Sequence, residues 1–373
     1  MTGQNAISTW NRTPLSNRLG IEYPIIQGPL GGLSSQRLTA AVSNFGGLGS
    51  FGAVGLNPGV LEDVIAEIRA LTSKPFAINL WVSTEDEGAF SSGKEAFTKA
   101  LALISGHIEK LGDTLPAYQP YVPVRFEDQA RVLLDAEVPV FSFIFGVPPK
   151  EILDECRAKG IVMIGAATTP AEAVTLEGAG VDVIVASGFE AGGHRGSFLR
   201  SSEESLTGTF SLVPQVADVV DVPVVAAGGI ADARGVVAAL ALGADGVQMG
   251  TAFLACEESG ANEHHRAALL GGKASETALT RGFTGRLARG IKNELLEELN
   301  RPGVDILPYP LQRYLMKSLS SVAEKAGRPE LFPMWAGQSA NLSRHTDATT
   351  LLRSLVSEVS LAADAVVRWN AAR

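Results

Sequence analysis

The sequence predicts an α/β fold, a (β/α)8 (TIM) barrel with an inserted helical segment and a C-terminal helical cap subdomain. Short apolar runs recur along the chain, and each is followed by a segment with helical spacing. The 373 residues are 46% hydrophobic and include 40 glycines, which suits a large core with many tight connections. Eight such units predict a barrel whose active site lies at the carboxyl ends of the strands.

The eight apolar runs are the predicted strands. They are nearly continuous in Val, Ile and Ala rather than alternating with polar residues, which is typical of parallel strands covered on both faces. They span residues 23–27, 47–51, 76–80, 138–145, 161–165, 183–186, 224–227 and 246–249.

Several segments between these strands carry helix signals. Thr169 can cap a helix that has Pro170 in its first turn, and Asp232 can cap the stretch that follows it. Both stretches end at a glycine before the next strand, where a left-handed residue is expected to end a helix. Strands and helices therefore alternate, as a barrel requires.

Two regions are longer than the simple repeat. Residues 82–137 exceed one helix and its connections, so extra helices are expected there. After the last strand the chain continues to residue 373, well beyond the one helix that completes a barrel. We therefore expect a barrel at 15–279, with the insertion at about 82–137, and a helical cap at 280–373 that packs on the barrel mouth.

Composition excludes several classes of partner. The net charge is −9 and there is no run of Lys or Arg, which argues against a nucleic-acid surface or an anionic membrane patch. No segment reaches the roughly 18 apolar residues of a membrane helix, and the amino terminus lacks signal-peptide features, so a cytoplasmic protein is expected. Cys156 and Cys256 lack metal-ligand spacing, so no metal site is expected. A small molecule is the expected partner of a monomer or homodimer.

A glycine-rich turn with one histidine, residues 186–196, follows the sixth predicted strand. His194 is the only side chain of this turn that titrates near neutrality, and Ser187 ends the strand at the barrel mouth. The pattern indicates the rim of an active site, although His194 could also only bond a backbone carbonyl and seal the turn. The small residues that would let backbone amides approach a ligand are Gly188, Ala191, Gly192 and Gly193.

Glycine turns also follow the last two strands, at residues 226–235 and 248–253. Barrel enzymes commonly bind phosphate through backbone N–H groups in the loops after strands seven and eight. The alternative is that these glycines only make short turns. The residues expected at the phosphate end are Gly228, Gly229, Gln248, Gly250 and Thr251.

The early strand ends place few charges at the mouth. The residues there are Gly28, Pro29, Leu30 and Asn79, which suit a flat and mostly apolar ring such as that of FMN rather than a sugar phosphate.

The stretch 47–52 matches a dinucleotide-binding fingerprint letter for letter. Its glycines lie within or around a predicted strand, and no helix pattern follows, so an NAD site is not expected there.

The segment 307–319 places Tyr309, Arg313 and Lys317 at i, i+4 and i+8. These side chains share one face if a helix begins near Pro308. An ordinary solvated face is the alternative interpretation.

The motif EAGGHRG around His194 resembles the histidine signature of the nitronate monooxygenases, and it is closest to their first class. QGPLGG, AAGGI, QMGT and YPLQRYLMK extend the resemblance over most of the chain. The resemblance implies an FMN enzyme that oxidises alkyl nitronates, with nitroalkanes as further candidates, using O2 to give a carbonyl compound and nitrite.

The resemblance also implies residue roles. The stretch 28–30 would pack on the isoalloxazine, Asn79 would contact the site, the late glycine loops would hold the phosphate, and His194 would lie beside the flavin. Where the family has a second tyrosine, this chain has Arg313, whose fork could bind a carboxylate or the nitronate group and favour an anionic substrate. The stretches 283–293 and 334–338 also resemble the family and would build the cap or close over the cofactor.

Three rival assignments use the same barrel. One is an FMN-dependent NAD(P)H:quinone or enoyl reductase, and another is a non-redox barrel that binds a phosphorylated metabolite. An IMP-dehydrogenase-like enzyme would need a nucleophilic cysteine on an active-site loop. Cys156 lies in a helix-like stretch and Cys256 lies just past the last strand region, so this third assignment is discounted.

Overall fold

The computed structural model describes residues 10–89, 93–120 and 122–371. Eight parallel strands form one sheet in the order β1-β9-β8-β6-β5-β4-β3-β2, and a parallel bridge between Ile26 and Leu48 brings its two edges together. The sheet is thus a nearly closed barrel, which confirms the predicted fold class. The strands are β1 (Ile25–Gln27), β2 (Gly49–Gly52), β3 (Phe76–Trp81), β4 (Val140–Ile144), β5 (Val162–Ala167), β6 (Val183–Ser187), β8 (Val224–Ala227) and β9 (Gly246–Met249).

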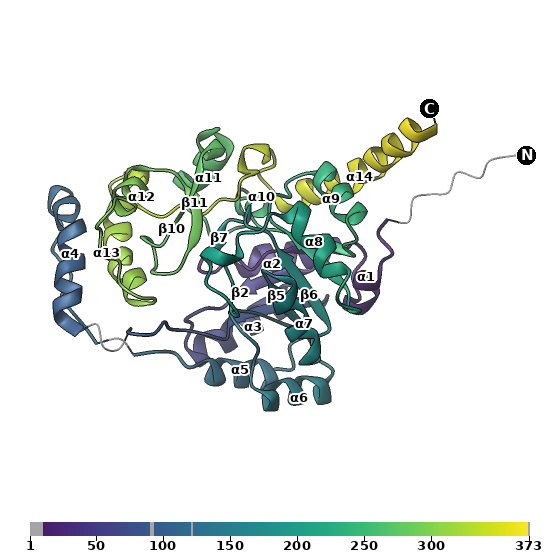
Figure 1. The fold of residues 1–373 in the computed structure, drawn as a ribbon, viewed down its shortest axis with the longest axis horizontal. Helices are drawn as coiled ribbons and strands as arrows, with labels where there is room; N and C mark the ends of the chain where they lie inside the picture. The colour runs from purple at the N-terminus through teal and green to yellow at the C-terminus, as the bar shows by residue number, and fades with distance from the viewer. Residues whose placement is uncertain (1–9, 90–92, 121, 372–373) are drawn as a thin grey trace, which may run out of the picture.

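Helices surround the barrel (Figure 1). Their apolar faces and the outward faces of the strands form one buried hydrophobic cluster. Two of these helices have the N-caps that the sequence predicts. Thr169 Oγ1 accepts from Glu172 N at 3.2 Å, and Asp232 Oδ1 accepts from Arg234 N at 3.0 Å. The surrounding helices are α2 (Gln36–Phe45), α3 (Pro58–Leu71), α5 (Phe126–Asp135), α6 (Lys150–Lys159), α7 (Pro170–Gly178), α8 (Thr209–Ala217), α9 (Ala233–Ala241) and α14 (Ala348–Ala371).

The C-terminal helix α14 belongs to the barrel rather than to the cap. It packs between α9 and α2, and Leu352 and Val359 are fully buried in the same cluster as the barrel helices. The expected cap at 280–373 is therefore corrected at its C-terminal end. The physical reason is that the last strand and its helix are separated by a long insertion, so that neighbours in the barrel are distant in sequence.

The amino-terminal end of the barrel is closed by α1 (Pro14–Leu19). Leu15 and Leu19 pack into the barrel interior against inward residues of the strands, including Val140 and Val225. The amino end is filled by side chains, so space for a ligand is left at the carboxyl end.

The long insertion after β9 forms a separate layer over the barrel mouth. Within the segment 82–137, α4 (Gly93–Lys110) packs against α13 of this layer, and α5 covers the barrel; Figure 1 shows α4 beside α13 at the far left. The expected extra helix of that segment is thus part of the cap. The remaining elements are α10 (Thr251–Leu254), α11 (Glu263–Leu270), α12 (Glu294–Leu299), α13 (Leu311–Lys325), β10 (Thr277–Thr280), β11 (Ala288–Ile291) and four short 3-10 helices, Glu203–Ser205, Lys273–Ser275, Pro329–Leu331 and Ala340–Leu342.

A second sheet connects the cap to the barrel. Its strand order is β10-β11-β7, and β7 is the two-residue strand Gly193–His194 that follows β6. His194 pairs with Ala288 in an antiparallel register. The histidine turn is therefore held by the cap as well as by the barrel.

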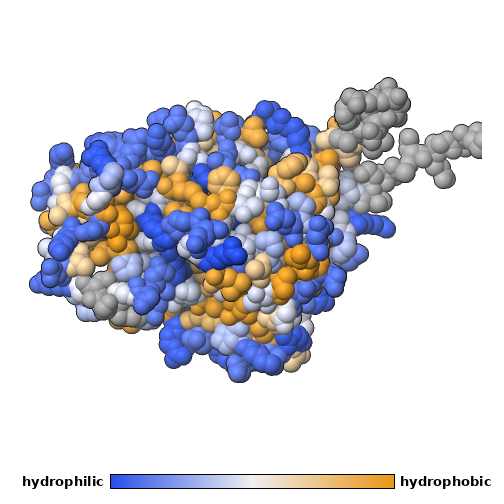
Figure 2. All heavy atoms as spheres, in the orientation of Figure 1, coloured by the Kyte–Doolittle hydropathy of each residue, from blue (hydrophilic) through white to orange (hydrophobic). Residues whose placement is uncertain are grey.

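Hydrophilic side chains cover much of the face seen in Figure 2, with apolar patches between them. None of the helices in the described ranges combines the length and the apolar character needed to cross a membrane.

Candidate active site

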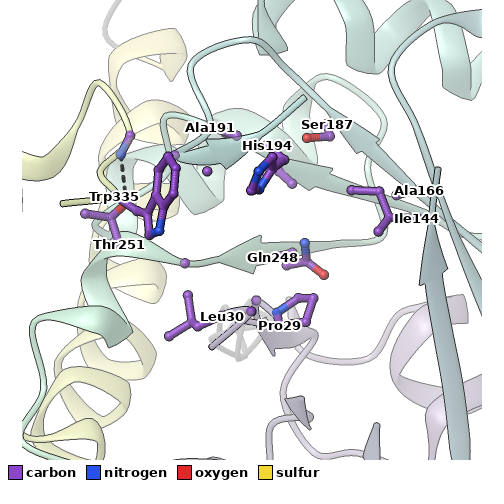
Figure 3. A pocket seen from close by; sticks show the side chains of 18 of the residues that line it. Pro29, Leu30, Ile144, Ala166, Ser187, Ala191, His194, Gln248, Thr251 and Trp335 are labelled. Carbon is purple, nitrogen blue, oxygen red and sulfur yellow. Dashed lines mark hydrogen bonds between the residues drawn. The ribbon is translucent and has the colours of Figure 1, made fainter. Parts of the chain in front are cut away.

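A cavity of about 380 Å³ lies at the carboxyl ends of the barrel strands, below the cap. Its size falls within the usual range for small-molecule and cofactor sites. Figure 3 shows Pro29 and Leu30 on one side of this space and His194, Ala191 and Trp335 on the other. The residues proposed from sequence that line it are Gly28, Pro29, Leu30, Asn79, Ser187, Ala191, Gly192, Gly193, His194, Gly228, Gly229, Gln248, Gly250, Thr251 and Arg313.

Three other proposed residues do not line the cavity. Gly188 lies behind it: its N–H donates to Ala227 O at 2.8 Å, and a Cβ there would lie 2.0 Å from Thr209 Oγ1. Gly188 thus allows the end of β6 to pack on α8. Tyr309 is buried behind His194, and the side chain of Lys317 is exposed on the cap.

Tyr309, Arg313 and Lys317 do not share one face of a helix as expected, although Arg313 Nη1 donates to Tyr309 Oη at 3.3 Å. Helix α13 begins at Leu311, so Tyr309 precedes the helix, and its carbonyl accepts from Asp86 N. Arg313 alone of the three lines the cavity. The i, i+4 spacing predicts a face only for residues that lie within one helix.

The end of the cavity at β8 and β9 presents backbone donors. Gly228 and Gly229 have φ of +103° and +73°, a left-handed conformation that glycine adopts without strain. Within the described chain, the amides of Gly229, Ile230 and Gly250 donate to no protein acceptor. Convergent amides of this kind suit a phosphate group.

The middle of the cavity suits a flat ring. Pro29, Leu30, Ile144, Ala166 and Val185 supply an apolar lining from four strand ends. Polar groups there are few, and Asn79 Nδ2 donates to Ser142 Oγ at 3.0 Å. A long apolar slot that ends in backbone amides fits FMN.

A strap from the cap, residues 334–340, covers the end of the cavity at β8 and β9. Gly337 N donates to Thr251 Oγ1 at 2.9 Å, and Ser339 Oγ donates to Gly229 O at 2.7 Å. His265 is buried, and its Nε2–H donates to Trp335 O at 2.8 Å; burial lowers the pKa of His265 to about 4, so the ring is neutral. The strap is thus fixed to the loops after β8 and β9.

His194 lies among aromatic rings on the side of the cavity opposite Pro29 and Leu30 (Figure 3). Ring centroids of Trp81, Trp335 and Tyr309 lie 4.8, 5.4 and 6.4 Å from that of the imidazole. His194 Nε2 is 2.9 Å from Thr284 Oγ1. Burial, followed by the positive charges of Arg313 and Arg286, lowers the pKa of His194 to about 3, so this imidazole is neutral at physiological pH.

Arg286 supports the aromatic wall from behind. Its guanidinium lies 4.4 Å from the ring centroid of Phe145 and 4.6 Å from that of Tyr309, and its Nε donates to Asp86 Oδ1 at 2.7 Å. The side chain is buried and ion-paired, so its charge is held in place near His194. Asp86 comes from the segment after β3, which ties the cap to the barrel.

Arg195 and Glu190 hold the histidine turn. Arg195 is buried and donates to the carbonyls of Ser205 and Ser187. Glu190 accepts from Thr209 N at 2.9 Å, and its own carbonyl accepts from Gln338 N at 2.9 Å. The turn therefore has a fixed backbone on both sides of its glycines.

Several residues of the cavity wall were not found from the sequence. Thr284, Trp335, Ser339 and Trp81 line it. The stretches 283–293 and 334–338 contain two of them, but no local pattern shows which side chains point inward. Thr284, Trp335 and Ser339 enter the site through contacts between cap and barrel that are distant in sequence, whereas Trp81 ends the barrel strand β3.

Comparisons with known proteins show the family of the chain. The family model described as nitronate monooxygenase matches residues 12–358. Probable nitronate monooxygenases of Staphylococcus aureus strains Newman and N315 are 41% identical over 363 residues, which is 94% of this chain and 98% of theirs.

Two solved structures are similar over nearly the whole chain. Nitroalkane oxidase from Streptomyces ansochromogenes has a TM-score of 0.85 and 37% identity, covering 95% of this chain and 100% of that one. FabK from Thermotoga maritima has a TM-score of 0.74 and 28% identity, covering 96% and 99%. The predicted resemblance is confirmed: the chain belongs to the nitronate monooxygenase family and is an oxidoreductase.

Proposed function

We propose that the protein binds FMN and oxidises alkyl nitronates, with nitroalkanes as further candidates, using O2 to give a carbonyl compound and nitrite. Membership of the family supports a nitro compound as the substrate. The observation that carries the proposal is the arrangement of the cavity: a neutral His194 faces an apolar slot that ends in unpaired amides.

Residues of this chain would hold the cofactor at both ends. Gly228, Gly229, Gly250 and Thr251 would bind the phosphate through N–H groups and a hydroxyl, and Pro29 and Leu30 would pack on the ring. Bound FMN would supply the electron chemistry with the nitro compound and with O2.

The protein would orient the substrate and exclude water. Trp81, Tyr309 and Trp335 enclose His194, so little solvent competes for the groups that meet the substrate. With a proton on the ring nitrogen that faces the cavity, His194 would hydrogen-bond the nitro group of a bound substrate; with a lone pair there, it would take the α-proton of a neutral nitroalkane. The positive charges of Arg286 and Arg313 lie near enough to depress the pKa of His194, and they would also favour an anionic substrate.

An anaerobic experiment tests the proposal. Purified protein is mixed with ethylnitronate while the flavin absorbance is followed, and O2 is then admitted and nitrite assayed. We expect the flavin absorbance to change with the nitronate and nitrite to appear only after O2. A flavin that ignores nitronate and bleaches with NADH or NADPH would indicate the reductase, and a protein without flavin would indicate the phosphometabolite barrel.

Arg313 is proposed to select substrates that carry a carboxylate. Its guanidinium lines the cavity, and Nη1 donates to Tyr309 Oη at 3.3 Å. Among the described residues no carboxylate lies within ion-pair distance of it. A cavity guanidinium without an acidic partner is suited to a bidentate carboxylate.

Arg313→Tyr is therefore expected to lower kcat/KM for a carboxylated nitronate by about tenfold to a hundredfold, the usual loss for a hydrogen-bonded charge. For ethylnitronate the value should change little. The ratio of the two kcat/KM values is the measurement, and Lys317→Gln, an exposed cation on the same helix, is the matched control. An unchanged ratio in Arg313→Tyr would contradict the proposed selection.

A further inference from the structure

We infer that Thr284 is a positioning residue that holds the proton of the His194 imidazole on Nε2 and leaves Nδ1 as the nitrogen offered to the substrate. The inference deepens the proposed function and rests on it for the identity of the substrate. The hydrogen-bond geometry around Thr284 carries it.

The hydroxyl of Thr284 has one hydrogen and two lone pairs, and the structure gives each a partner. Its hydrogen goes to Arg286 O at 3.2 Å, and its oxygen accepts from Arg286 N at 3.3 Å. The remaining lone pair faces His194 Nε2 at 2.9 Å. An acceptor in this position requires that Nε2 carry the proton.

The opposite arrangement would leave a buried carbonyl without a donor. If the Thr284 hydroxyl turned toward His194, Arg286 O would lose its hydrogen bond, and the described residues supply no other donor to it. Thr284 and Arg286 are both buried, so such a loss is costly. The imidazole is neutral and has a single N–H, so a proton on Nε2 means a lone pair on Nδ1.

Nδ1 is accessible from the cavity. Nδ1 makes no hydrogen bond with the described residues. Among those residues, the fully buried side-chain nitrogen and oxygen atoms that lack a hydrogen-bond partner are Ser50 Oγ and Ser343 Oγ. Nδ1 is not one of them, so it is not shut off from the cavity. His194 lines the cavity, and Figure 3 shows it between Trp335 on one side and Ile144 and Ala166 on the other. The free lone pair therefore meets whatever occupies this space.

The turn that carries Thr284 is held firmly in place. Gly285 has φ of +98°, and a Cβ there would lie 2.5 Å from Tyr309 N, so the turn packs directly on the backbone before α13. Arg286 on its other side is fixed by Asp86. The pairing of His194 with Ala288 then sets the imidazole against Thr284.

This assignment has a chemical consequence. A lone pair on Nδ1 can accept the α-proton of a neutral nitroalkane, whereas it has no hydrogen to donate to the oxygens of a nitronate. Loss of the Thr284 hydroxyl should therefore slow oxidation of nitroethane more than oxidation of ethylnitronate.

The tautomer can be measured without an activity assay. Protein labelled with 15N-histidine is examined as purified by long-range 1H–15N correlation, and the His194 signals, among five histidines, are those absent from His194→Asn. We expect the Nε2–H pattern in the native protein and in Thr284→Ser, and a shift toward Nδ1–H in Thr284→Val. An Nδ1–H pattern in the native protein, or an unchanged pattern in Thr284→Val, would overturn the inference.

Kinetics supply a second readout. Thr284→Val should lower kcat/KM for nitroethane by about 10²-fold, the lower range for loss of a general base, and leave that for ethylnitronate unchanged or higher. In the His194→Asn background the same substitution should have no effect on nitroethane. An equal loss on both substrates would contradict the positioning role.

Thr280→Val is the matched control. Thr280 is a buried threonine of the same segment, and its hydroxyl donates to Asn300 Oδ1 at 2.6 Å, away from the cavity. It should leave the His194 signals and the substrate ratio unchanged. If Thr284→Val does not fold, the spectra of the native protein and of Thr284→Ser still determine the tautomer. If no nitro compound is oxidised, the proposed function is wrong, but the same spectra still test the role of Thr284.

Discussion

Replacing His194 by asparagine is expected to lower kcat/KM for nitroethane by about 10²- to 10⁴-fold, the range for loss of a general base. Asparagine keeps a polar group in the cavity but has no basic nitrogen, so the α-proton of a neutral nitroalkane has no acceptor. Ethylnitronate needs no proton removal, so its loss should be smaller. Steady-state kinetics with both substrates are the measurement.

Flavin content and a second histidine serve as controls for this prediction. His194→Asn should keep its FMN, because the proposed phosphate ligands Gly228, Gly229, Gly250 and Thr251 lie in the loops after β8 and β9. His264→Asn changes a half-buried histidine that packs near Phe332, outside the cavity, and should behave as the native protein. If His194→Asn kept native kcat/KM for nitroethane, His194 would not be the base.

The pH profile checks the same role. The pKa of His194 is lowered from 6.5 to about 3, chiefly by burial, so the imidazole gains a proton only as pH falls toward 3. The base form is the neutral one, and kcat/KM for nitroethane should therefore stay level from about pH 8 to pH 5, where an unshifted histidine would already be charged. A loss of activity centred near pH 6.5 would show that the depressed pKa does not apply to the working enzyme.

The barrel could be predicted because its strands are covered on both faces. Continuous Val, Ile and Ala runs mark such strands locally, and the topology of the fold then places the carboxyl ends together. Gly28, Asn79, His194 and Gly228 could be assigned to one cavity in this way. The place of α14 could not, because a helical pattern does not show which helices it packs between.

The rest of the site depends on contacts between segments that are distant in sequence. Thr284 meets His194 only because a two-residue strand pairs with β11, and two residues carry no recognisable strand pattern. Tyr309 and Lys317 were placed by helical spacing, which fails because the helix begins at Leu311. Local periodicity can predict a face, but the boundary of the element decides which residues share it.

Replacing Gly192 by alanine is expected to raise the Kd of FMN by about tenfold to a hundredfold. A Cβ at Gly192 would lie 2.6 Å from Ala336 C and from Gly337 N, both backbone atoms of the strap. Neither can move without moving the strap itself. The hydrogen bonds from Gly337 to Thr251 and from Ser339 to Gly229 would then be lost, and the phosphate end would open to solvent.

The measurement is the Kd of FMN for the apoprotein, followed by flavin fluorescence, together with the thermal unfolding midpoint of each variant. Gly178→Ala is the matched control, because a Cβ at this glycine of α7 meets no atom within 4 Å. A Gly192→Ala protein with the thermal midpoint of the control and a weaker Kd places the loss in the strap. Native FMN affinity in Gly192→Ala would contradict the prediction, because it would mean that the strap can shift without affecting the loops after β8 and β9.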